Sequence, residues 1–135
     1  MTKVSSYMDF IDSYTAFAKK RLINKVLHKK AGYKIKDEYG NEVEVGYKSE
    51  IIAVSLKDDP DKVRGKAAKL IMFEEAGSFS ELGAAWSIAR PSVEQDGVAF
   101  GLMIAFGTGG DARSHNFAAL KDMFYNPDGY NCISF

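Results

Sequence analysis

The chain has 135 residues, which is enough for one domain with a buried core. Its 46% hydrophobic and 27% charged residues exclude a disordered or fibrous chain, and its single cysteine excludes a disulfide framework and a multi-cysteine zinc site. The net charge is zero, but residues 1–36 carry nine lysines and arginines against two acids, and residues 37–135 carry the matching acidic excess.

The basic segment has two interpretations. It is typical of a surface for nucleic acid or an acidic partner, and equally of a solvated helix face. The solvated face is favoured, because all the bases except Arg21 are lysines and no aromatic stacking pattern accompanies them. The longest apolar run, residues 98–106, is too short to cross a bilayer, and the N-terminus lacks the apolar stretch of a signal peptide. We therefore expect a protein of a reducing compartment with no membrane contact.

The first half of the chain predicts one long helix and then short strands. Apolar residues from Tyr7 to Leu22 recur at helical spacing, which predicts a basic amphipathic helix over residues 6–30 that Gly32 ends. A hairpin is expected to follow around the turn Glu38-Tyr39-Gly40-Asn41, and then a strand and a short helical turn. These expected elements are the strands 33–36, 43–47 and 50–56 and the turn at Pro60.

The second half alternates strands and helices. The predicted elements are a strand at 69–73, a helix that Ser78 and Glu81 begin and Arg90-Pro91 ends, a strand at 98–106, a helix at 116–125 and a strand from 131. Residues 98–106 are apolar on both faces, which predicts a strand covered from both sides. This order predicts an α/β fold with parallel strands in a single domain, in which a basic helix (1–32) precedes an α/β core (33–135).

Two adjacent acids, Glu74 and Glu75, directly follow the apolar strand Leu-Ile-Met-Phe. Acids at this place would lie at the carboxyl edge of a sheet, where α/β proteins bind ligands. Mg²⁺ suits such a pair, because it takes carboxylate and water oxygens. The arrangement is that of a Walker B motif, in which one acid holds Mg²⁺ and the next activates water. A strand that simply ends in two exposed acids would look the same.

The strand at 98–106 runs into a glycine-rich loop, Gly107-Thr108-Gly109-Gly110. If this strand lies parallel to the one before Glu74, the loop brings Thr108 close to the same edge. Glycine lets the backbone approach closely. The two motifs together favour a nucleotide site over a plain strand-to-helix turn.

The stretch from VGYKSEIIAVSLKDDPDKVRGKAAKLIMFEEAGSF through AWSIARPSVEQDGVAFGLMIAFGTGGD to FYNPDGYN resembles the ATPase domain of the large terminase subunit of tailed bacteriophages. That family packages double-stranded DNA into procapsids. The resemblance implies a three-layer P-loop NTPase-like (ASCE-type) parallel sheet. It also implies that Glu74 binds Mg²⁺, that Glu75 is the catalytic acid, and that Arg64 acts on a neighbouring subunit's site. Gly107, Thr108 and Gly109 would form the loop that couples hydrolysis to movement.

This chain departs from the family's pattern in two places. The first Walker B acid is usually Asp, and here it is Glu74. A P-loop requires G-x-x-x-x-G-K-[ST], but Pro60 replaces the first glycine before Gly65-Lys66 and Ala67 replaces the Ser or Thr. We therefore expect the central piece of an ATPase domain, with an incomplete sheet, that lacks the phosphate loop and is inactive alone.

Three functions follow from these features. The first is part of a DNA-packaging ATPase that uses Mg²⁺ and ATP in the complete protein, although the piece alone requires neither. Its implied partners are double-stranded DNA, the portal protein, the small terminase subunit and the procapsid, in the host bacterial cytoplasm. Its unpaired sheet edges predict self-association. The second is a catalytically silent module that binds DNA or a subunit through residues 19–36. The third is a metal-dependent nuclease using Glu74, Glu75 and Asp111, which is disfavoured because neighbouring strand residues point to opposite faces.

Overall fold

The structure, a computed structural model, describes residues 2–16, 19–56, 59–108 and 115–134. The chain folds into two compact units, Met1–Val54 and Ser55–Phe135. The first unit contains helix α1 (Thr2–Tyr14) and strands β1 (Arg21–Lys25), β2 (His28–Ala31), β3 (Tyr33–Lys36), β4 (Glu42–Val45) and β5 (Glu50–Ile52).

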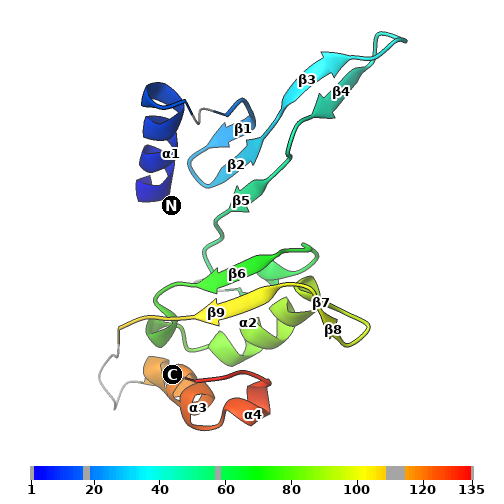
Figure 1. Ribbon diagram of the computed structural model, residues 1–135. Coiled ribbons are helices and arrows are strands. Elements are labelled where there is room, and N and C mark those ends of the chain that lie inside the picture. Colours follow the sequence, from blue (N-terminus) through cyan, green and yellow to red (C-terminus); the bar gives the residue numbers. More distant parts are fainter. Residues whose placement is uncertain (1, 17–18, 57–58, 109–114, 135) are drawn as a thin grey trace. The chain divides into compact units, whose positions relative to one another are not determined.

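The strands of the first unit form two small antiparallel sheets (Figure 1). One has the order β1-β2-β5, and the other is the β3–β4 hairpin, in which Tyr33 pairs with Val45 and Lys36 with Glu42. The predicted hairpin is therefore confirmed. Its turn is stabilised by the Asp37 carboxylate, which accepts hydrogen bonds from the amides of Tyr39 (2.9 Å) and Asn41 (2.8 Å).

The predicted helix over residues 6–30 is wrong beyond Tyr14, and so is the basic helix 1–32. Residues 21–31 form the β1–β2 hairpin, which pairs in turn with β5. The apolar spacing around Leu22 and Val26 suits a helix, but helix propensity is a weak preference that tertiary pairing overrides. β5, with its β-branched Ile51 and Ile52, provides that pairing by bonding to β2.

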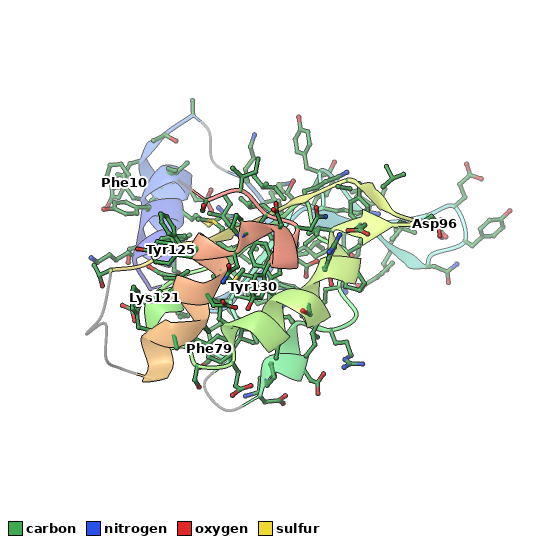
Figure 2. The ribbon with its side chains drawn as sticks, turned by 90° about the horizontal axis from the view of Figure 1, so that it is seen from below. Phe10, Phe79, Asp96, Lys121, Tyr125 and Tyr130 are labelled. Atoms are coloured by element: carbon green, nitrogen blue, oxygen red, sulfur yellow. The ribbon has the colours of Figure 1, made fainter. Side chains whose placement is uncertain are left out.

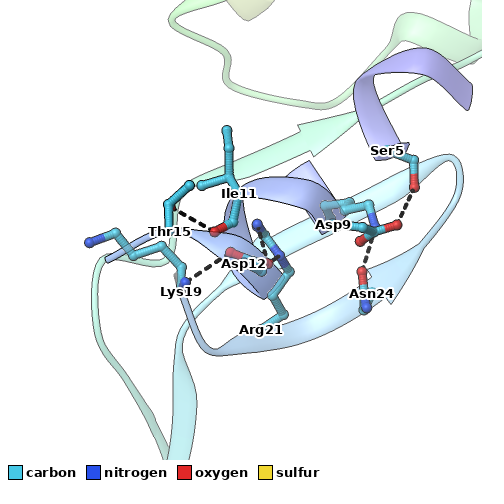
Figure 3. Close-up of polar contacts among 9 residues, drawn as sticks. Ser5, Asp9, Ile11, Asp12, Thr15, Lys19, Arg21 and Asn24 are labelled. Atoms are coloured by element: carbon cyan, nitrogen blue, oxygen red, sulfur yellow. Dashed lines mark hydrogen bonds and ion pairs between the residues drawn. The ribbon is translucent and has the colours of Figure 1, made fainter. Parts of the chain in front are cut away.

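Helix α1 docks on β1 and β2 through charged side chains (Figure 3). Arg21 donates from Nε (2.7 Å) and from Nη2 (2.6 Å) to Oδ2 of Asp12. Lys29, whose side chain is only 3% exposed, lies 3.1 Å from Oδ1 of Asp9 and donates to Asn24 Oδ1 at 2.5 Å. A buried ammonium needs such partners, because an unpaired buried charge is strongly destabilising.

The predicted apolar face of α1 is exposed. It faces away from the ion pairs, and exposures reach 68% for Tyr7, 58% for Phe10 and 77% for Tyr14. Helical spacing correctly groups these side chains on one stripe. It does not show which stripe is buried, because the acidic stripe makes the contacts with the sheet.

The second unit alternates short strands and helices. Its elements are the 3₁₀ turn η1 (Pro60–Val63), β6 (Leu70–Phe73), η2 (Ala76–Ser78), α2 (Leu82–Ala89), η3 (Arg90–Ser92), β7 (Glu94–Gln95), β8 (Val98–Ala99), β9 (Leu102–Ala105), α3 (His115–Tyr125) and α4 (Pro127–Tyr130). β6 and β9 pair in parallel, with α2 between them in sequence, as predicted. The predicted helix at 116–125 and the helical turn at Pro60 are confirmed.

One face of the β6–β9 pair packs on α2, and α2, α3 and α4 all lie on that side (Figure 1). The predicted face of α2 is confirmed, since it is buried against Phe73 and Met123; its members are Leu82, Ala85, Trp86 and Ala89. The rings of Phe73 and Trp86 lie 5.8 Å apart. Trp86 Nε1 donates to the carbonyl of Tyr130 (3.2 Å), which connects α4 to α2.

The opposite face of the pair is exposed, which corrects the prediction that both faces are covered. Burial alternates along both strands. The exposed side chains are Leu70 (50%), Met72 (56%), Leu102 (57%) and Ile104 (37%). The sequence pattern is that of a doubly covered strand, but the helices that the structure describes lie on one side alone.

Three smaller predictions are wrong. Residues 98–106 form two strands instead of one, because Gly101 separates β8 from β9. Ser78 does not cap α2, since its hydroxyl donates to the carbonyl of Glu75 (2.9 Å) and Glu81 occupies the cap position. Residues 131–134 form no strand.

The extended parallel sheet of a three-layer fold stays a prediction. Within the described residues, β6–β9 is the only parallel pair.

No described helix combines the length and the apolar character needed to cross a membrane.

The docking of α1 predicts a pH dependence. The amide of Lys19, followed by the Arg21 guanidinium, lowers the pKa of Asp12 below its ordinary 3.8. A lowered pKa in the folded state stabilises the fold above about pH 4, and that stabilisation is lost as the pH falls further. Asp12→Asn should speed hydrogen exchange of the β1 and β2 amides at pH 7, and the difference from wild type should shrink near pH 3. An equal difference at both pH values would contradict this account.

Gly101 predicts a steric effect on stability. A Cβ there would lie 2.5 Å from the carbonyl oxygen of Ala68 and 3.1 Å from that of Lys69, both of which are backbone atoms. Gly101→Ala should lower the free energy of unfolding by about 1–3 kcal/mol, measured by urea unfolding with Trp86 fluorescence. Gly129→Ala is the control, because nothing lies within 4 Å of its added Cβ. It should leave stability unchanged or raise it by up to about 1 kcal/mol, since alanine loses less chain entropy than glycine on folding.

Candidate functional site at the carboxyl edge of the parallel pair

The parallel pairing brings the two predicted motifs together. Phe73 is the register partner of Ala105, so both strands end at the same edge. The ladder continues past the strands, since Phe106 N donates to the Phe73 carbonyl (3.1 Å) and Ala76 N donates to the Phe106 carbonyl (3.0 Å). The loop holding Glu74 and Glu75 therefore lies directly against the loop that begins at Gly107.

Glycines allow these two loops to touch. A Cβ on Gly107 would lie 3.0 Å from Ala76 N and 3.1 Å from the Cα of Glu75. A Cβ on Gly77 would lie 2.9 Å from the carbonyl oxygen of Thr108 and 3.1 Å from the Phe117 ring of α3. Each loop thus uses a glycine where the other loop's backbone passes. Gly77 was not singled out from the sequence, although a glycine two residues after an acid pair is a usable signal.

Glu75 has an unusual backbone conformation. Its φ of 53° and ψ of 36° lie in the left-handed region. This conformation costs a residue with a Cβ roughly 1–2 kcal/mol. It is held by the short turn η2, in which the Glu75 carbonyl accepts hydrogen bonds from the amide and from the hydroxyl of Ser78, both at 2.9 Å. Strain of this kind gathers at functional sites, where surrounding structure maintains it.

The carboxylates of the acid pair are accessible. Glu74, Glu75 and Thr108 are all exposed. Neither carboxylate forms an ion pair with another residue that the structure describes. Both carboxylates are therefore open to solvent.

A complete metal site is not formed by the described residues, among which no three His, Cys, Asp or Glu side chains come together. Gly109 and Asp111, which were also predicted at this edge, lie outside the described residues. Of the three acids in the nuclease alternative, the structure therefore describes Glu74 and Glu75 but not Asp111.

Arg64 lies away from the acid pair. It follows η1 and precedes the amino end of β6, whereas Glu74 and Glu75 follow its carboxyl end. Its side chain is 70% exposed and donates to Asp61, with Nη2 at 2.6 Å from Oδ1. Arg64 shares a shallow groove with Ser87 and Ile88 of the second half of α2. It therefore does not complete the carboxyl-edge site of its own chain.

Comparisons with models of protein families, with curated proteins and with solved structures find no match.

The conformation of Glu75 predicts a gain in stability when the strain is removed. Glu75→Gly should raise the free energy of unfolding by about 0.5–1 kcal/mol, because glycine adopts a positive φ without penalty. Glu74→Gly is the matched control and should lower stability by a similar amount, since glycine there only adds chain entropy to the unfolded state. Urea unfolding followed by Trp86 fluorescence measures both. A loss of stability in both variants would show that Glu75 is not strained.

Proposed function

We propose that this chain supplies the acidic and coupling loops of a Mg²⁺-dependent ATPase of the kind found in the large terminase subunit of tailed bacteriophages. The observation that carries the proposal is the parallel β6–β9 pair, which places the loop of Glu74 and Glu75 against Gly107 and Thr108. In this assignment Glu74 holds Mg²⁺ and Glu75 orients and deprotonates the attacking water. Thr108 would lie near the γ-phosphate of bound ATP, in the loop that couples hydrolysis to movement.

The physical argument rests on charge. Phosphoryl transfer develops negative charge on oxygen atoms, and a Mg²⁺ ion held at the edge of a sheet offsets it. The exposed and uncompensated carboxylates of Glu74 and Glu75 suit a cation that keeps most of its water. The strained backbone of Glu75 fits a side chain that must be aimed, because a relaxed backbone would direct it elsewhere.

The proposal requires a phosphate-binding loop from another part of the complete protein, since this sequence contains no G-x-x-x-x-G-K-[ST]. In this proposal Arg64 acts on the ATP site of a neighbouring subunit. It precedes the amino end of β6, whereas the acids of its own chain follow the carboxyl end. The exposed apolar face of the β6–β9 pair supports self-association, or the packing of another part of the complete protein on that face. The further partners would be double-stranded DNA, the portal protein, the small terminase subunit and the procapsid, in the bacterial cytoplasm.

A second candidate function is a DNA- or subunit-binding module without catalysis. It is favoured by the exposed lysines of the first unit, which lie outside the carboxyl-edge site.

A magnesium titration of this chain tests the proposed site. Amide resonances of Glu74, Glu75, Gly107 and Thr108 should shift together as MgCl₂ is added, and Glu74→Gln should abolish the shifts. Asp96→Asn is the matched control, because Asp96 is an acid at the tip of the β7–β8 hairpin, away from this edge (Figure 2). Shifts that persist in Glu74→Gln, or that disappear in Asp96→Asn, would contradict the assignment.

Hydrolysis is tested at two levels. The chain alone should show no ATPase activity above background, because it has the acids but no phosphate loop. In the full-length gene product, Glu75→Gln should keep ATP binding and lower turnover by about 10²-fold or more. Turnover by the chain alone, abolished by Glu75→Gln, would show that its phosphate site had been missed.

A further inference from the structure

A shallow groove of about 280 Å³ lies in the first unit, where β2 passes into β3 and β4 passes toward β5. We name it the lysine–tyrosine groove, and its principal residues are Lys19, Lys20, Gly32, Tyr33, Gly46 and Tyr47. They come from three separate stretches of the chain, so nothing in their sequence spacing connects them. All of them are described and belong to one compact unit.

Two of the residues that line the groove are glycines. Gly32 (φ 138°) and Gly46 (φ 101°) both adopt backbone conformations that other residues rarely adopt. A Cβ on Gly46 would lie 3.1 Å from the Cα of Gly32, so the two backbone segments approach closely where β2 passes into β3 and β4 passes toward β5. The amide of Gly32 donates to the carbonyl of Lys20 (2.8 Å), which fixes the lysine segment beside these glycines. The groove is therefore held by backbone contacts and does not depend on side-chain rotamers alone.

Each lysine lies over a tyrosine ring. The ammonium of Lys19 is 5.6 Å from the centroid of the Tyr47 ring, and that of Lys20 is 5.0 Å from the centroid of the Tyr33 ring. Tyr47 is 83% exposed and Tyr33 is 44% exposed. Cation–π contacts hold the lysines beside the rings and leave ring surface open to solvent.

The charges of these two lysines are not neutralised within the described part of the chain. Other bases of this unit form ion pairs with carboxylates: Arg21 with Asp12, Lys29 with Asp9, Lys30 with Glu44, and Lys34 with Glu42. Lys19 and Lys20 form none among the residues described. Lys25 and Lys36 also form no ion pair there, but they differ from Lys19 and Lys20, each of which lies over a tyrosine ring of the groove.

We propose that the lysine–tyrosine groove binds single-stranded nucleic acid, with phosphates on Lys19 and Lys20 and an unpaired base stacked on Tyr47. The combination of exposed aromatic rings with adjacent ammonium groups is the chemistry that single-strand binding uses, because every base offers a stacking face and every phosphate a charge. A duplex offers the phosphates alone, since its bases are already stacked on each other. This binding involves none of the residues of the proposed ATPase, and it specifies the ligand of the second candidate function, on which it rests.

The test measures binding of a fluorescein-labelled 20-mer oligothymidylate to the full chain by anisotropy. Lys19→Ala/Lys20→Ala should reduce the slope of log K against log salt concentration by about 1.4, since each phosphate contact on a single strand contributes about 0.7. Lys25→Ala/Lys36→Ala is the matched control, because it removes the same charge from exposed lysines of β1 and β3 that form no ion pair in the described residues. It should leave the slope unchanged to within about half that amount.

The stacking contact is tested at Tyr47, which lies outside every strand. Tyr47→Ala should weaken binding about tenfold, and Tyr47→Phe should restore it, because the ring alone is needed. Tyr39→Ala is the aromatic control, because Tyr39 is 87% exposed and lies in the turn of the β3–β4 hairpin. This variant should bind as the wild type does.

The nature of the ligand is tested with three probes of equal length. Oligothymidylate or oligouridylate should bind at least tenfold more tightly than a duplex, and the tighter of the two single strands identifies DNA or RNA. Equal affinity for the duplex would overturn the proposal and leave a general phosphate surface. Unchanged affinity in Tyr47→Ala, or equal losses in the two double-lysine variants, would also overturn it.

Discussion

The parallel pairing of β6 with β9 is the constraint on which the candidate active site depends. Four register pairs align the carboxyl ends of the two strands, and two further hydrogen bonds carry the alignment into the loops. Glu75 and Gly107 meet only because of that register. A slip of one residue would turn each strand's side chains to the other face and separate the acids from the glycine loop. Gly77 and Gly107 then let the two backbones close on each other.

The first unit is organised by charge instead of apolar packing. α1 contacts the sheet with its acids, and its aromatic stripe stays exposed. Neutralising Arg21 and Lys29 in this way leaves Lys19 and Lys20 as uncompensated cations beside two tyrosine rings. Some bases of residues 1–36 are therefore held in ion pairs, whereas Lys19 and Lys20 form none among the described residues and lie at the lysine–tyrosine groove.

Local patterns predicted the elements that depend on few distant contacts. The β3–β4 hairpin follows from its turn residues, the buried face of α2 from helical spacing, and the parallel β6–β9 pair from a strand–helix–strand order. The helix over residues 6–30 failed, because the apolar spacing of residues 21–31 suits a helix until β5 offers a strand to pair with. The strand at 98–106 failed at Gly101, where the backbone of Ala68 leaves no room for a side chain.

The carboxyl-edge site and the lysine–tyrosine groove differ in how far the sequence predicts them. Glu74, Glu75 and the glycine loop are short motifs that each follow a strand, so their meeting could be predicted from the parallel order. Arg64 shows the limit of that reasoning, because closeness in sequence places it at the opposite end of β6 from the acids. The lysine–tyrosine groove could not be predicted. It forms where residues 19–20, 32–33 and 46–47 come together beside two separate sheets, and no sequence pattern links these segments.

Cross-strand proton–proton contacts measured by NMR test the central claim most directly. The pairing of β6 with β9 predicts nuclear Overhauser effects between the Hα protons of Gly107 and the Hα of Glu75, because a Cβ on Gly107 would lie 3.1 Å from that Cα. It also predicts contacts between the amide of Phe106 and the Hα of Glu74, the residue that follows the carbonyl of Phe73 to which that amide donates. An antiparallel pattern, or a parallel pattern shifted by one residue, would contradict the account, because either arrangement separates the acid pair from the glycine loop.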